Sequence, residues 1–230
     1  MKSSDTFCRI IRIVVPFLLM PAVVIAGALI FREKRYAVLS VAMVILSQLL
    51  FFAGFEKRTV GTRRMVIAAV MTALSVIGRY VFAFVPAFKP ITAIVVITAI
   101  WIGGETGFLV GSLSALISNF IFGQGPWTPF QMFAWGMTGL LAGFLSKPLK
   151  KSRVMLAVYG FLSGAAYSLF MDVWTVLWYN GTFDIKLYTA ALVSALPHTA
   201  CYAVSNVIFL LLLSKPFGQK LERVKIKYGV

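Results

Sequence analysis

The chain has 230 residues, of which 60% are hydrophobic, and its mean hydropathy is +0.91. Soluble domains contain about 45–50% apolar residues, so these values exclude an ordinary soluble domain and indicate a polytopic membrane protein. The net charge of +15 would suggest a nucleic-acid partner in a soluble protein. In a membrane protein it has another source, because Lys and Arg gather on the cytoplasmic side, and no nucleic acid is expected.

Eight apolar segments follow one another along the chain, and several are long enough to cross the hydrocarbon core of a bilayer. The first resembles a signal peptide but has no small-x-small cleavage site, so we expect a retained helix. A basic linker at 56–64 divides the chain into an N-terminal extension with two apolar helices, 1–61, and a six-helix membrane core, 62–230. The sequence therefore predicts an all-α, polytopic membrane helix bundle, with apolar segments at 13–31, 36–55, 65–85, 91–102, 107–122, 130–145, 154–178 and 187–213.

The basic residues favour one orientation of the core. They gather in the linker, in the 147–153 loop and in the tail after residue 213, whereas the opposite loops hold only Lys89 and Lys186. This bias places both ends of the core in the cytoplasm and the protein in the cell membrane. Arg32, Lys34 and Arg35 would then face outside, so the sequence leaves open whether both N-terminal segments span.

Polar and aromatic residues converge on the predicted outer half of the core, which is typical of a pocket with apolar walls and a few polar groups. Each of these residues also has a structural interpretation. The Trp and Tyr residues could form an aromatic belt at the membrane surface, and the amides could hold helices together. Asp172 could form an ion pair with Arg79, and His198 could be a hydrogen-bonded core residue. The candidates for substrate binding are Arg79, Asn119, Gln124, Trp127, Gln131, Asp172, Trp178, Tyr179, Asn180 and His198.

The stretch 123–136 combines Gly and Pro with two Trp and two Gln and has no charged residue. We expect it to form a loop at the outer mouth that opens into a helix. In this prediction the loop is a lid or rim, with Trp127 as an apolar wall and Gln131 as a polar anchor for substrate.

The sequence lacks the motifs of the common enzyme classes. It has no nucleotide-binding Gly-x-x-x-x-Gly-Lys-[Ser/Thr] loop and no His-Glu-x-x-His, and its single histidine cannot form a multi-histidine zinc site. We therefore expect a binding protein with no metal site, not an enzyme. A membrane enzyme that uses Asp172 and His198 for acid–base chemistry remains the alternative from another class.

Ala69 and Ala73 on the first core helix form a small-xxx-small pair, with Thr72 beside them. Small residues at this spacing allow another helix to approach closely. The pair predicts either packing within the chain or a docking face for a partner membrane subunit.

Together these features resemble the substrate-binding (S) component of energy-coupling factor (ECF) vitamin transporters. The resemblance covers about Thr62 to Leu213 and depends on the alanine pair, the Gly104-Glu105 turn, and the 127–131 stretch with Trp135-Gly136 after it. It implies that the chain captures a vitamin from outside, with Trp135 also in the site. It further implies docking through Ala69, Thr72 and Ala73 on a membrane coupling subunit. Two cytoplasmic ATPases would use ATP, so this chain would bind no cofactor.

The loop and the N-terminal extension look most like the branch associated with cobalamin. Pantothenate, whose carboxylate would prefer Arg79, a queuosine precursor and other vitamins remain alternatives, as does a scaffold subunit without a ligand.

Overall fold

The computed structural model describes residues 2–26, 36–53 and 58–229, and within these residues every regular element is a helix. The predicted all-α membrane bundle is confirmed. Five of the described helices are long and apolar enough to cross a membrane by length and composition, and two shorter apolar helices accompany them.

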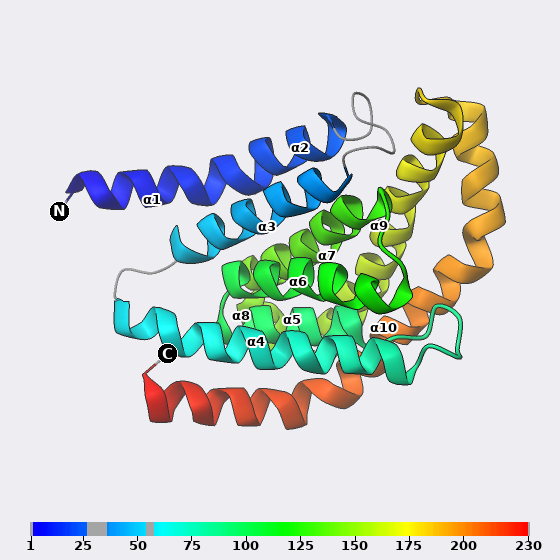
Figure 1. Ribbon diagram of the computed structural model, residues 1–230. Helices are drawn as coiled ribbons and strands as arrows, with labels where there is room; N and C mark the ends of the chain where they lie inside the picture. The colour runs from blue at the N-terminus through cyan, green and yellow to red at the C-terminus, as the bar shows by residue number, and fades with distance from the viewer. Residues whose placement is uncertain (1, 27–35, 54–57, 230) are drawn as a thin grey trace.

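The N-terminal part is an antiparallel helical hairpin (Figure 1). Its first arm consists of α1 (Lys2–Val14), a π-helical turn η1 (Val15–Leu19) and α2 (Met20–Ala26), and its second arm is α3 (Tyr36–Ala53). The π turn contains Pro16, which has no backbone N–H to donate to the helix. Arg32, Lys34 and Arg35 lie outside the described residues.

Six helices of the core correspond to the six predicted segments, and a short helix joins two of them. They are α4 (Arg58–Val81), α5 (Ile91–Ile102), α6 (Gly104–Phe122), α7 (Trp127–Phe144), the short α8 (Ser146–Lys151), α9 (Arg153–Asn180) and α10 (Ile185–Tyr228).

Two features of these helices differ from the sequence-based expectation. The loop expected at the start of the 123–136 stretch is shorter than predicted, because α7 begins at Trp127 and not near Phe130. The predicted C-terminal tail is helical, since α10 continues to Tyr228. The division of the chain after residue 61 stays a prediction; α4 begins at Arg58, and α3 packs on α6 and α7.

Helix α5 is the centre of the core. All its residues except Trp101 are buried, and α4, α6, α7 and α10 pack around it. It contains only aliphatic side chains, Thr and Trp. A helix that is apolar on all sides is typical of a protein core or of a membrane span.

Helices α6 and α7 come unusually close because glycines face each other along their contact. A Cβ atom added at Gly139 would lie 2.5 Å from the backbone carbon of Gly107, and one added at Gly111 would lie 2.5 Å from the carbonyl oxygen of Trp135. Gly104 and Gly143 form a third contact of this kind. Small residues stabilise helix pairs in membranes by allowing extensive van der Waals contact.

Helix α10 bends as it crosses the bundle (Figure 1) and contains Pro197 and Pro216. Proline removes a helical hydrogen bond and bends a helix at that point. Beyond Pro216, Gly218 lies against the indole of Trp101, and the Lys225 ammonium donates to the Trp101 carbonyl at 3.5 Å. The bend therefore brings the C-terminal part of α10 onto α5.

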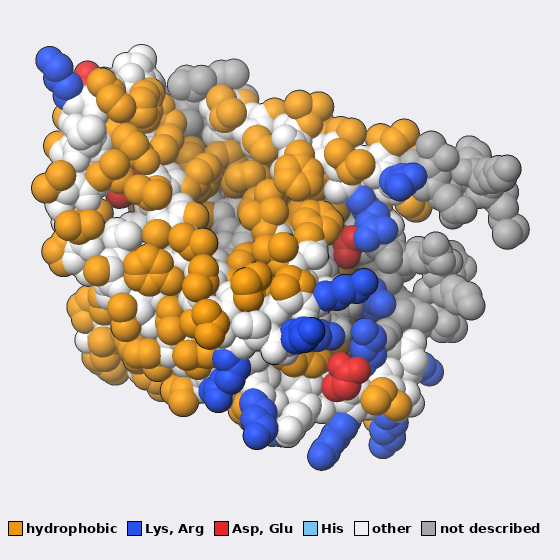
Figure 2. All heavy atoms as spheres, turned by 180° about the vertical axis from the view of Figure 1, so that it is seen from behind, with side chains coloured by type: hydrophobic (Ala, Val, Ile, Leu, Met, Phe, Trp, Pro, Cys, Tyr) orange, Lys and Arg blue, Asp and Glu red, His pale blue; other side chains and the backbone are white. Residues whose placement is uncertain are grey.

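Basic side chains gather at one end of the molecule, where α4 begins and the chain ends (Figures 1 and 2). We call this the basic end and the opposite one the far end. At the basic end Arg12 of α1 forms an ion pair with Glu105, the first acidic residue of α6, with Nε 2.6 Å from Oε1. This contact ties the N-terminal hairpin to the core.

A Gly139→Ala substitution should destabilise the bundle, because its methyl group would collide with the backbone of Gly107. We expect a loss of about 1–3 kcal/mol, measured as a lower midpoint of thermal unfolding in detergent. Gly160→Ala is the matched control, since its methyl group would meet mainly the end of the flexible Leu210 side chain. Equal midpoints for the two variants would contradict the importance of the α6–α7 contact.

Candidate functional site

A buried hydrogen-bond network at the far end joins α4, α6 and α7. The Arg79 guanidinium at the end of α4 donates from Nη1 to Ser118 Oγ at 2.5 Å and to Asn119 Oδ1 at 2.9 Å. The Asn119 amide in turn donates to Thr128 Oγ1 at 3.0 Å and to Gln131 Oε1 at 2.9 Å. Asn119 is thus a helix–helix contact, as one of its predicted interpretations required, and it also orients Gln131.

The turn between α6 and α7 belongs to the same network. The Gln124 amide donates to the carbonyl of Leu116 at 2.8 Å, and its oxygen accepts from the Thr128 hydroxyl at 2.9 Å. Gly123 ends α6 with φ of +101°, a backbone conformation that favours glycine. Side chains on both sides of the turn therefore hold it in one shape.

A second buried polar contact, at the Tyr202 hydroxyl, lies beside the rings of Trp135 and Tyr167. The Tyr202 hydroxyl accepts from the Trp135 indole N–H at 2.8 Å and lies 2.6 Å from the Thr92 hydroxyl. The Trp135 and Tyr167 rings stack nearly parallel with centroids 5.0 Å apart, and the Arg79 guanidinium lies 5.3 Å from the Trp135 ring. These contacts connect α5, α7, α9 and α10 to the arginine network.

An aromatic wall extends between α7 and α9 toward the far end. Trp127 meets Trp174 edge to face at 5.9 Å, and Trp174 stacks on Trp178 at 5.8 Å. Phe130 contacts Phe170 and Trp174 below them. The three Trp residues are half-buried, so parts of their rings remain free to contact a ligand.

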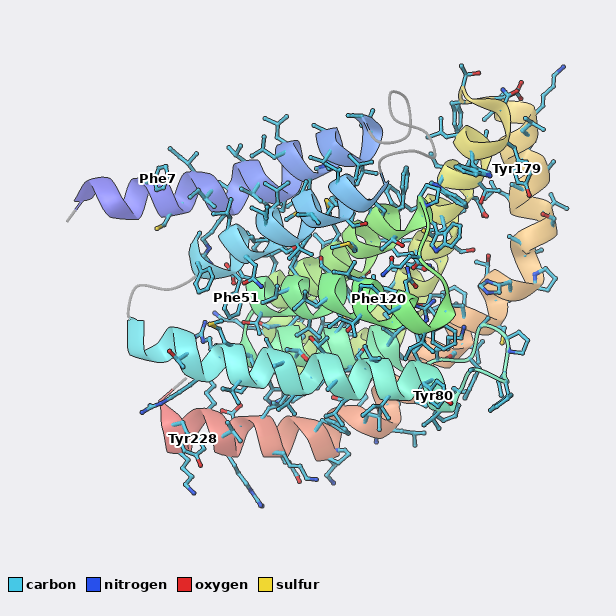
Figure 3. All side chains as sticks on the ribbon, viewed as in Figure 1. Phe7, Phe51, Tyr80, Phe120, Tyr179 and Tyr228 are labelled. Atoms are coloured by element: carbon cyan, nitrogen blue, oxygen red, sulfur yellow. The ribbon has the colours of Figure 1, made fainter. Side chains whose placement is uncertain are left out.

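Two predicted site residues lie apart from the others. Tyr179, at the end of α9, is 82% exposed and lies at the tip of the helix (Figure 3). Asn180 is exposed and donates only to Thr182, in the turn that follows α9. Both are at the exposed end of α9, apart from the networks around Asn119.

Asp172 and His198, the residues of the enzyme alternative, lie on the neighbouring helices α9 and α10. Among the described residues no hydrogen bond or ion pair joins them, and Asp172 Oδ2 is buried without a hydrogen-bond partner. His198 is exposed and lies over the Tyr202 ring, with centroids 6.4 Å apart. The predicted Arg79–Asp172 ion pair is also absent from the described residues, since Arg79 donates to Ser118 and Asn119 instead.

Sequence reasoning missed several residues of the site. Thr128 and Ser118 are short hydroxyl residues whose importance is visible only when α6 and α7 are placed together. Tyr202 lies four residues after His198, a spacing that places both on one helix face. Lys89 precedes α5, and its Nζ lies 5.7 Å from the Phe122 ring; partial burial, followed by the charge of Arg79, lowers the pKa of its ammonium group.

The predicted docking residues on α4 do not share one surface. Ala69 and Ala73 are exposed, whereas Thr72 is 2% exposed and faces the bundle interior. Of the three predicted docking residues, only Ala69 and Ala73 therefore present small side chains on the surface of α4.

Replacing Asn119 by Leu should destabilise the far end, because the buried Arg79 would lose one of its two acceptors. Loss of a partner for a buried charged group costs about 1–3 kcal/mol or more, so the midpoint of thermal unfolding in detergent should fall. Asn180→Leu, in the exposed turn, removes an amide of the same kind and should leave the midpoint nearly unchanged. An Asn119→Leu midpoint equal to that of the wild type would contradict this network.

Comparison with known proteins agrees with these observations. A family model described as the S component of ECF-type riboflavin transporters matches residues 59–223, which is more than half of the chain. No curated protein and no solved structure gives a match. The family is one of transporter components and not of enzymes. The chain therefore belongs to the family of S components of ECF-type riboflavin transporters.

Proposed function

We propose that the chain captures riboflavin, or a flavin closely related to it, at the far end of the bundle and delivers it for ATP-driven uptake. Membership of the family implies a vitamin-binding membrane subunit and an energising module with ATPases. The identity of the substrate, the position of its site and the orientation of the chain in the membrane go beyond family membership and are proposed here. The observation that carries it is the convergence of the aromatic wall and the amide network at one end.

The chemistry of a flavin suits both parts of this site. Its flat ring system can stack on indole and phenol rings, which Trp127, Trp174 and Tyr167 supply. The donors and acceptors at one edge of the ring match amide groups such as those of Gln124 and Gln131. The family name, which specifies riboflavin, supports the same choice.

Cobalamin, the preference from the sequence, is the second candidate. Its peripheral amides would also suit Asn119, Gln124 and Gln131, which the fold brings into one network. These amides already form hydrogen bonds within the network, however. A small planar flavin would have to break fewer of these hydrogen bonds than cobalamin would.

The orientation follows from the basic end. Lys and Arg gather on the cytoplasmic side of membrane proteins, so the far end would face outside and receive the substrate there. The exposed Ala69 and Ala73 on α4 would then form the docking face for the membrane coupling subunit.

The direct test is equilibrium binding of riboflavin, cobalamin and pantothenate to the purified chain in detergent without nucleotide. We expect one-to-one binding of riboflavin and weaker or no binding of the others. Preferential binding of cobalamin would favour the second candidate, and binding of no vitamin would contradict the proposed function.

Trp127→Ala should weaken riboflavin binding by more than about tenfold, which corresponds to roughly 1.4 kcal/mol, because it removes the outer part of the aromatic wall. Tyr179→Ala is the control, since it removes an exposed aromatic ring at the same end and should leave the dissociation constant unchanged. If both variants bind as the wild type does, Trp127 is only a membrane-surface anchor.

A bulky residue on the alanine pair should separate binding from transport. Ala73→Phe should abolish vitamin uptake in cells that contain the energising module, while the purified variant binds substrate normally. Val158→Phe, at an exposed position of α9, is the matched control and should transport normally. Normal uptake by the Ala73→Phe variant would refute the docking face.

A further inference from the structure

Two cations at the far end face the same aromatic ring. The Arg79 guanidinium carbon lies 4.7 Å and the Lys89 ammonium nitrogen 5.7 Å from the centroid of Phe122. Arg79 comes from the last turn of α4, and Lys89 from the segment that joins α4 to α5. Among the described residues neither cation forms an ion pair, whereas the Arg12–Glu105 ion pair lies at the basic end.

The Arg79 charge is unusually buried for a group without an anion. The residue is 8% exposed, and although Nη1 has two acceptors, Nε is buried with no hydrogen-bond partner. Buried charges in proteins are normally paired or bound to a ligand. The guanidinium therefore has both an uncompensated charge and a donor available for an acceptor.

The segment that carries Lys89 is held in place. Ala87 has a positive φ of +58°, which is strained for a residue with a side chain. The Lys89 backbone N–H donates to Ser205 Oγ on α10 at 2.9 Å, and the Ser205 hydroxyl lies 3.4 Å from the Lys89 carbonyl. These contacts fix the backbone of Lys89, and its ammonium group approaches the same Phe122 ring as the Arg79 guanidinium.

We propose that Arg79 and Lys89 form a subsite for an anionic group of the substrate, and that the chain therefore favours a flavin phosphate monoester over neutral riboflavin. This inference rests on the proposed flavin-binding function. A guanidinium presents donors in a geometry that suits phosphate oxygens, and a lysine adds a compact second charge. An anion between them would relieve their repulsion and supply an acceptor for Arg79 Nε.

The test compares riboflavin with flavin mononucleotide, its phosphate monoester, on the full chain in phosphatidylcholine nanodiscs. The wild type should bind the phosphate monoester about tenfold or more tightly than riboflavin, since hydrogen bonds to charged groups stabilise a complex to this extent. Lys89→Gln should weaken binding of the monoester about tenfold more than binding of riboflavin. Lys89→Arg keeps the charge and should keep most of the preference.

Lys186→Gln is the matched control, because it removes a lysine from the same end whose side chain makes no contact with Arg79 or Phe122. It should retain the wild-type preference. Equal effects of Lys89→Gln on the two flavins, or a wild type that prefers riboflavin, would overturn the subsite and leave the proposed function intact. Binding of neither flavin would overturn both.

A lipid headgroup is another source of phosphate, and the nanodisc composition distinguishes it. If the subsite serves the substrate, the preference for the monoester should persist when phosphatidylglycerol replaces phosphatidylcholine. Loss of the preference in phosphatidylglycerol would assign the subsite to a lipid headgroup and overturn the inference.

Discussion

The close contact between α6 and α7 determines where the polar groups of this protein can meet. Glycines from both helices remove the side chains that would keep the two backbones apart. In a membrane no hydrophobic effect draws helices together, so this kind of close packing and the hydrogen bonds across it supply much of the stability. The same approach brings Asn119 within 3.0 Å of Thr128 and 2.9 Å of Gln131. A wider spacing would break these hydrogen bonds and leave Arg79 with fewer partners.

The two ends of the bundle carry side chains of different chemistry. The basic end carries lysines and arginines at the surface, and the ion pair of Arg12 with Glu105 attaches the N-terminal hairpin there. The far end contains amides, hydroxyls and stacked rings within the protein, together with a buried arginine that has no carboxylate partner among the described residues. Ionisable groups inside a membrane bundle are costly and usually serve a function. The proposed substrate site at the far end would account for this cost.

Much of the fold was predictable from the sequence, because apolar segments longer than about 17 residues and the positions of Lys and Arg are direct consequences of the bilayer. Helix α5 was predicted with its observed ends, since Pro90 and Gly103 bound it. The length of α10 was not predicted, because the apolar pattern ends near residue 213, whereas the helix continues through the basic residues to Tyr228. Likewise, Trp127 was assigned to a loop because Gly and Pro precede it, yet Pro126 caps the helix that begins there.

The site was predicted only in part. Arg79, Asn119, Gln124 and Gln131 were expected at one end and form one network, but the partners Ser118, Thr128 and Tyr202 are common residues that sequence alone does not distinguish. Tyr179 and Asn180 were included for their place in the sequence, and they lie at the exposed end of α9. The most direct test of the central claim is a structure determined with riboflavin bound. The account predicts the flavin ring against Trp127, Trp174 and Tyr167, with its polar edge toward the Asn119 network. A flavin bound at the basic end, or on the lipid-facing surface, would contradict it.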